Sequence, residues 1–352
     1  MSMSGAMSAA ISGLKSQMQG LNVVGNNIAN VNTNGYKAQR ITFKESIYNT
    51  LSAGSAGTDT VGSTNPQQIG YGCSVGTIDL DMTSGDLVST GRAMDCTISG
   101  DGFFLVGPKN ITIEDAGDVN SLTLTRVGDF EFRDGYLTDG QGNVVYGFVT
   151  ANGTDGGIVE DGDKLSTSTD LVPIRLPLKS TAQGSEGETA YVGIGDDGHN
   201  VDPATDVDGY INYTNMSIDA NGKITCTNSD TKEVVVVGYI ALGSVENPNG
   251  VLHTEGPYYS AGDAAGSITV STPGSAVTGY LRNQQAGNNT SADDKLLSGS
   301  TVKLMTSFLE GSGTDLATEF TNMILYQRGY QANTRIVTVT DSMLEELVNM
   351  KR

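Results

Sequence analysis

The sequence predicts an α+β protein that is mainly β, with β-rich modules in the middle of the chain and a coiled-coil-like pair of helices formed by the two termini. Three observations support this prediction. Apolar residues recur at heptad spacing at both ends of the chain. Between the ends, Asp-Gly and Asn-Gly pairs separate short β-branched runs, which is typical of hairpins. The chain has 352 residues, 46 of them Gly and none Trp, which favours several modules of short strands over one large core.

The first predicted element is a helix within residues 1–35. Its apolar residues alternate steps of four and three and therefore share one face, whereas the opposite face carries Ser, Gln, Asn and Gly with little charge. Gly13, Gly20 and Gly25 each weaken an isolated helix by up to about 1 kcal/mol relative to Ala. We therefore expect a helix that is marginal alone and becomes ordered when it packs. Its apolar seam consists of Met7, Ile11, Leu14, Met18, Leu21 and Ile28.

The middle of the chain is divided by its composition. Residues 36–75 include a stretch rich in Ser, Gly and Thr and are interpreted as a linker or extended arm. Residues 76–150 and 210–309 carry most of the hairpin signals and are expected to form a middle β domain. Residues 151–209 are the richest in Gly and Asp and the least periodic, so we expect an outer, solvated β module there.

The last predicted element is a second helix within residues 310–352, which together with residues 1–35 would form a terminal helical core domain. Thr314 and Asp315 follow a Gly-Ser stretch and are candidate amino-terminal caps. An amphipathic helix usually packs on the core of its own domain, but no other helical segment of this length exists for these two to join. The two helices can pair with each other, with neighbouring copies, or both. The seam of this second helix consists of Leu316, Phe320, Met323, Tyr330, Val337 and Leu344.

Charge and hydropathy exclude several classes of partner. The formal net charge is −20, from 40 acidic and 20 basic residues, which argues against nucleic acid and anionic lipid. The two ends are close to neutral, so most of the negative charge lies in the middle of the chain. No apolar run approaches the ~18 residues of a membrane span, so we expect no membrane insertion. The first twenty residues lack a basic leader and a continuous apolar stretch, so we expect any export to proceed without a cleaved signal peptide.

The sequence offers no residues for catalysis, cofactor binding or metal binding. It has two histidines, His199 and His253. Neither lies near a Cys or a glycine-flanked Ser, and the two are not at the spacing of metal ligands. Cys73, Cys96 and Cys226 are odd in number and widely spaced, which supports neither a zinc site nor a disulfide framework; we expect them to be buried as small apolar residues. We therefore expect a structural protein rather than an enzyme. The rival class is a secreted enzyme or adhesin built from β-modules, which would have ordered ends and a binding cleft.

Residues 23–37, Val-Val-Gly-Asn-Asn-Ile-Ala-Asn-Val-Asn-Thr-Asn-Gly-Tyr-Lys, closely resemble the amino-terminal signature of flagellar rod and hook proteins. Asn and Gly crowded after a heptad helix end the helix and turn the chain, since both tolerate positive φ. The signature residues are Gly25, Asn26, Asn27, Asn30, Asn34 and Gly35. Further stretches that resemble the same family, in the same order, are 84–95, 99–104, 126–130, 139–143 and 316–352. The resemblance does not cover residues 151–209.

Within this family, residues 65–72, Asn-Pro-Gln-Gln-Ile-Gly-Tyr-Gly, look like hook proteins of Gram-positive bacteria, and residues 151–209 lengthen the chain beyond typical rod proteins. Residues 68–72 also occur in similar form in distal rod proteins, so the distal rod subunit is the alternative. Tyr326 and Gly329 depart from many relatives, and we expect Gly329 to soften the second helix.

The resemblance implies a subunit of the bacterial flagellar hook that polymerises with itself into a curved helical tube, a universal joint that transmits torque from rod to filament. It implies four further partners: the hook cap, the distal rod, the hook-filament junction proteins and the flagellar type III export apparatus. The implied location is extracellular, in the flagellum, without cofactors.

Overall fold

The computed structural model of this chain describes residues 3–54, 56–57, 62–109, 113, 118–149, 171–180, 190–192, 207–210, 212–229, 232, 234–275 and 302–350. The chain divides into two compact units. The first, here called the helical unit, comprises residues 1–32, 37–81 and 313–352; the second, the β unit, comprises residues 33–36 and 82–312. A helix at each end and a β-rich middle confirm the predicted fold class.

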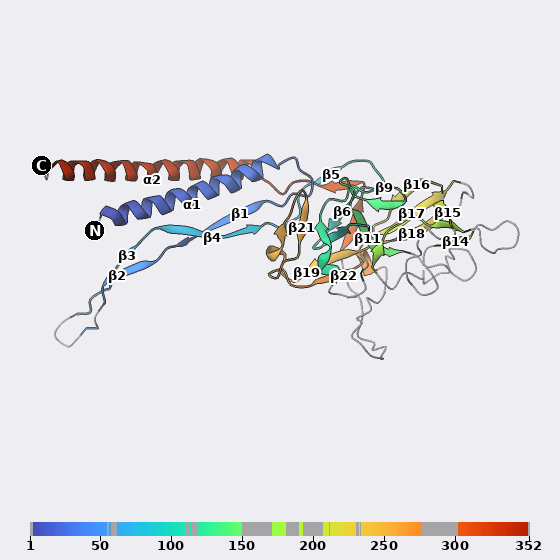
Figure 1. Cartoon of the computed structure of the whole chain (residues 1–352), viewed down its shortest axis with the longest axis horizontal. Coiled ribbons are helices and arrows are strands. Elements are labelled where there is room, and N and C mark those ends of the chain that lie inside the picture. The colour runs from blue at the N-terminus through green and yellow to red at the C-terminus, as the bar shows by residue number, and fades with distance from the viewer. Residues whose placement is uncertain are drawn as a thin grey trace. The chain divides into compact units, whose positions relative to one another are not determined.

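The helical unit consists of two long helices and a β arm. Its elements are α1 (Met3–Ala29), β1 (Gln39–Glu45), β2 (Tyr48–Ser52), β3 (Gln67–Gly70), β4 (Cys73–Leu80) and α2 (Leu316–Met350). The arm is made of two antiparallel pairs, β1 with β4 and β2 with β3. Within the helical unit, Figure 1 shows α1 and α2 side by side, and α1 also contacts β1 and β4. Strands therefore run through much of residues 36–75, which the sequence suggests as a linker or extended arm.

Both helices end where the sequence supplies capping groups. At the end of α1, the Asn30 side-chain amide donates to the carbonyl of Asn26 at 3.0 Å. At the start of α2, Oδ1 of Asp315 accepts from the backbone N–H of Ala317 at 3.1 Å, and Oδ2 accepts from the Thr318 hydroxyl. Asp315, one of the two predicted candidates, is therefore the cap that satisfies donors in the first turn of α2.

The β unit is built on antiparallel pairings. Its strands are β5 (Leu87–Ser89), β6 (Cys96–Ser99), β7 (Phe103–Gly107), β8 (Thr123–Thr125), β9 (Glu131–Arg133), β10 (Tyr136–Thr138), β11 (Val144–Val149), β12 (Val172–Pro173), β13 (Leu178–Ser180), β14 (Ala190–Val192), β15 (Val207–Tyr210), β16 (Tyr213–Ile218), β17 (Lys223–Asn228), β18 (Val234–Ile240), β19 (Leu242–Val245), β20 (Leu252–His253), β21 (Tyr258–Ser260), β22 (Ile268–Ser271), β23 (Lys303–Thr306) and β24 (Phe308–Glu310). The main sheet follows the order β16-β17-β18-β11-β7-β8-β21-β20. Its core includes the buried side chains of Phe104, Phe130, Val145, Ile224 and Val237.

Residues 171–176 lie within the range expected for the outer module and contact the main sheet. Strand β12 pairs with β11 of the main sheet, and Leu171, Ile174 and Leu176 are buried. This places residues 171–176 in the core of the β unit. Strands β13, β14 and β15 form a separate small sheet, and the remainder of 151–209 lies outside the described residues.

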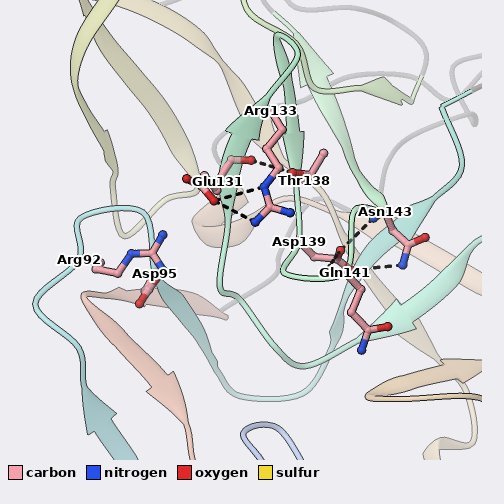
Figure 2. A network of polar contacts seen from close by, with 8 residues as sticks. All are labelled: Arg92, Asp95, Glu131, Arg133, Thr138, Asp139, Gln141 and Asn143. Carbon is pink, nitrogen blue, oxygen red and sulfur yellow. Dashed lines mark hydrogen bonds and ion pairs between the residues drawn. The ribbon is translucent and has the colours of Figure 1, made fainter.

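Side-chain hydrogen bonds shape the turns of the β unit. Between β10 and β11, Oδ1 of Asp139 accepts from the backbone N–H groups of Gln141 and Asn143 at 3.0 and 2.9 Å (Figure 2). Gly142 has a φ of 95°, which a residue with a side chain rarely adopts. The Asp-Gly-Gln-Gly-Asn stretch of the family resemblance is thus a hydrogen-bonded hairpin turn.

Candidate functional site

The two helices of the helical unit pack antiparallel. Asn27 near the end of α1 contacts Glu319 in the first turn of α2, whereas Gly13 near the start of α1 lies opposite Asn333 toward the middle of α2. Residues far apart in the sequence are therefore held together by one continuous helix–helix contact, as the paired termini predict. This pair is the candidate assembly site.

Glycines allow the helices to approach closely. A Cβ placed on Gly20 would lie 3.0 Å from Cε2 of Tyr326, and a Cβ on Gly13 would lie 2.6 Å from Nδ2 of Asn333. In the reverse direction, a Cβ on Gly329 would lie 3.0 Å from Cδ of Gln17. Each glycine thus receives a side chain of the other helix. The sequence predicts only that Gly329 softens α2 and does not predict this contact, for which the seven-residue spacing of Gly13 and Gly20 is the available signal.

Half of the twelve predicted apolar seam residues are exposed within one chain, and the other half are half-buried. Ile11 and Met18 on α1 are 41% and 51% exposed, and Phe320 on α2 is 51% exposed. Leu316, Tyr330 and Leu344 are also exposed, and the half-buried members of the seam are Met7, Leu14, Leu21, Ile28, Met323 and Val337. The helix pair therefore leaves about half of its apolar seam exposed within one chain.

The β arm uses another part of α1. The Ser12 hydroxyl lies 3.4 Å from the carbonyl oxygen of Tyr71, and the Ser16 hydroxyl donates to the carbonyl of Cys73 at 3.3 Å. Gly72 has a φ of 108°, and a Cβ there would overlap Oγ of Ser12. Ser12 and Ser16 of α1 are thus contact residues for the β arm.

Asn27 is the polar centre of the helical unit. Its side chain is fully buried, with Nδ2 donating to the carbonyl of Gln39 at 2.8 Å and Oδ1 accepting from the Gln39 N–H at 2.9 Å. The same Nδ2 lies 3.0 Å from Oε1 of Glu319. Burial raises the pKa of Glu319, and the hydrogen bond from Asn27 opposes that rise. One signature side chain therefore joins the end of α1, the start of β1 and the first turn of α2.

The other signature residues have different environments. Gly35 has a φ of 68°, and a Cβ there would lie 2.7 Å from Cγ2 of Val127, so the position requires Gly. Asn26 and Asn30 hydrogen-bond to each other at the end of α1. Gly25 and Asn34 are exposed. The signature thus combines a helix end, the buried hydrogen bonds of the Asn27 side chain (here called the polar clamp) and a turn.

The described part of the chain shows no group of His, Cys, Asp or Glu residues arranged to hold a metal ion. Cys96 and Cys226 are buried and Cys73 is half-buried, all with free thiols. Burial raises the pKa of the Cys226 thiol to about 11. Within the same residues, no helix is both long and apolar enough to cross a membrane.

Two protein families match the ends of the chain, where the helices lie. The family described as "Flagella basal body rod protein" matches residues 7–37, and the family described as "Flagellar basal body rod FlgEFG protein C-terminal" matches residues 305–350. The first match contains Asn27 and Gly35, and the second contains all of α2.

Whole proteins similar to this chain include both rod and hook proteins. It is 33% identical over 342 residues to the flagellar basal-body rod protein FlgG of Bacillus subtilis, with 97% of each chain covered. It is 27% identical over 460 residues to the flagellar hook protein FlgE of Borreliella burgdorferi, covering 97% of this chain and 98% of that protein. For the hook protein FlgE of Salmonella typhimurium the identity is 26% over 433 residues, covering 98% and 100%. The two hook alignments are longer than this chain, so those hook proteins contain residues that it lacks.

Proposed function

This chain belongs to the flagellar rod and hook protein family, and from that premise we propose that it is the structural subunit of the flagellar hook, polymerising through its terminal helices. The observation that carries the proposal is the helix pair itself. Its glycines lie against Asn333, Tyr326 and Gln17 of the opposite helix, whereas Ile11, Met18 and Phe320 stay exposed. Burying apolar surface yields about 25 cal/mol per Å², so covering this seam with a second copy would favour assembly.

The uncovered seam also relates folding to assembly. Within one chain α1 buries Ala10, Val23 and Val24, but Ile11, Met18 and Phe320 stay exposed, and isolated helices are marginal in water. Neighbouring copies would cover these exposed seam residues, so assembly would stabilise the helix pair beyond its stability in a single chain. Contacts of this kind between identical subunits, when they do not close into a ring, produce a helical tube.

The wider role proposed for the protein follows from the family. The tube would act as a universal joint between rod and filament, meeting the hook cap, the distal rod and the hook-filament junction proteins. The subunit would pass through the flagellar export apparatus. The acidic middle of the chain, within its formal charge of −20, suits polar, adjustable contacts between neighbouring β units during bending.

The distal rod subunit is the second candidate, and one observation favours it: the 33% identity over nearly the whole chain to a protein named FlgG. The resemblance of residues 65–72 to Gram-positive hook proteins favours the hook. Electron microscopy of polymers made by this chain separates the two, because a hook subunit should form curved tubes and a rod subunit straight ones.

The seam proposal is tested by placing a charge on it. Met18→Asp and Phe320→Asp should abolish polymerisation, because each would bury an unpaired carboxylate against a neighbouring copy. Asn22→Asp adds the same charge at an exposed polar position of α1 and serves as the control. Sedimentation and electron microscopy report the polymers, and circular dichroism reports that the β unit remains folded. Normal tubes from the two seam variants would contradict the proposal.

A further inference from the structure

Four segments of the β unit meet at one buried residue, Glu310. Its carbonyl accepts from the backbone N–H of Gly35 at 2.8 Å, and its Oε1 accepts from the backbone N–H of Gly85 at 3.0 Å. Its Oε2 lies 3.6 Å from Nη1 of Arg126. The side chains of Glu310 and Arg126 are each only 2% exposed. We call this group, made of Gly35, Gly85, Arg126 and Glu310, the Glu310 joint.

Close packing surrounds the joint. The N–H of Gly311 donates to the carbonyl of Asp86 at 2.7 Å, next to the Gly85 contact. The Arg126 guanidinium lies over the ring of Phe103, with Cζ 5.5 Å from the ring centroid. A Cβ on Gly35 would lie 3.2 Å from the backbone nitrogen of Val127. These contacts leave little room for either glycine-containing segment to move independently.

The Glu310 joint lies between the β unit and the segments that lead to the two helices. Residues 33–36 follow α1, and residues 310–312 precede α2, so both connections from the β unit toward the helices pass through this point. A buried ion pair adds little net stability when compared with apolar residues of the same shape, yet removing one partner leaves a costly uncompensated charge. Such a pair therefore enforces a specific arrangement more than it raises overall stability.

We propose that Arg126 and Glu310 are positioning residues that tie the two connections into a single joint, through which force passes between the helices and the β unit. The force-transmitting role rests on the proposed function in a hook or rod. The linkage of the two segments by Arg126 and Glu310 does not depend on that function. Opening the ion pair would break the hydrogen bond from the Gly35 N–H to the Glu310 carbonyl. Loss of the charge on one side chain would thus break a main-chain hydrogen bond of a different segment.

Hydrogen exchange of backbone amides in the full-length chain tests the tie. Glu310→Gln keeps an acceptor for Gly85 and removes the carboxylate of the ion pair, leaving Asp101 as another carboxylate that acts on Arg126. We expect the Gly35 amide to exchange at least about 100-fold faster than in the wild type, the lower end of the loss caused by breaking a buried pair. The amides of Ile174 and Ile240, which donate at 2.9 Å to main-chain carbonyls in the sheet, should change by less than about tenfold.

The control is the exposed ion pair in which Nη2 of Arg133 lies 3.0 Å from Oε2 of Glu131 (Figure 2). Glu131→Gln should leave the exchange of the Gly35 amide unchanged. Unchanged Gly35 exchange in Glu310→Gln, or equal acceleration of Gly35 and the sheet amides, would overturn the proposal.

A measurement on the wild type does not depend on any variant folding. If one joint holds both segments, the amides of Gly35 and Gly85 should open together and share the same protection against exchange. Protection that differs by more than about 100-fold between them would also overturn the proposal. Because these measurements use unassembled chains, a failure to polymerise would contradict the proposed function and leave the joint intact.

Discussion

Replacing Gly20 by Ala tests whether the glycines of α1 are contact positions or helix-weakening positions. In a helix interior, Gly→Ala stabilises by about 1 kcal/mol when nothing opposes the added methyl group. At Gly20 the methyl would lie 3.0 to 3.2 Å from three carbons of the Tyr326 ring. That ring also packs edge-to-face on Phe43, with centroids 5.9 Å apart, which limits its retreat.

The magnitude follows from these two opposing effects. Overpacking a tight contact costs about 1–3 kcal/mol, so Gly20→Ala should range from neutral to destabilising by about 2 kcal/mol. Gly25 is exposed in the same helix, and a Cβ there would meet nothing within 4 Å. Gly25→Ala should therefore stabilise the helical unit by about 1 kcal/mol, which places the two variants about 1–3 kcal/mol apart.

Urea unfolding followed by circular dichroism at 222 nm, together with hydrogen exchange of α1 amides, measures the two variants. A double-mutant cycle with Tyr326→Leu then isolates the contact, because the cost of Gly20→Ala should shrink once the ring is absent. Equal stabilisation by Gly20→Ala and Gly25→Ala would refute the reasoning. It would show that the helices do not pack through this glycine.

Three further predictions concern turns, the polar clamp and pH. Gly35→Ala should destabilise the β unit by more than Gly91→Ala, measured by urea unfolding, because both have φ near 70° but only Gly35 has a neighbour within 4 Å of its Cβ position. Asn27→Ala should destabilise the helical unit by about 2–4 kcal/mol through the loss of three buried hydrogen bonds, seen as faster exchange of α1 amides. Burial raises the pKa of Asp129 above its ordinary 3.8, so its stabilising contribution is complete below pH 3.8 and is lost as the pH rises through the raised value. Asp129→Asn should therefore stabilise the β unit at pH 7 relative to the wild type, and unfolding curves recorded down to pH 3 should show that advantage disappearing.

The helices could be predicted from sequence because heptad spacing is a local property. The face that packs inside the chain could not be predicted, since it depends on Tyr326 and Asn333, some three hundred residues from the glycines they meet. A glycine in a helix has the same intrinsic cost whether it is exposed, like Gly25, or contacted, like Gly20. The local pattern therefore identified the elements and the helix-weakening glycines, but not which of these glycines receive a side chain of the other helix.

The same limit applies to the signature and to the sheet. Asn27 and Asn30 are the same residue type three positions apart, yet only Asn27 is fully buried, because β1 and the distant α2 both contact it. Hairpin signals predicted strands, but the pairing of β12 with β11 depends on residues across a long intervening segment. Pairing order is a tertiary property, so short-range turn signals do not determine it.

The most direct test of the central claim is a cryo-electron microscopy reconstruction of a polymer formed by this chain. If the terminal helices drive assembly, α1 and α2 should remain paired through Gly20 and Tyr326, with Met18 and Phe320 buried against neighbouring subunits. A polymer in which these two side chains still face solvent would contradict the account.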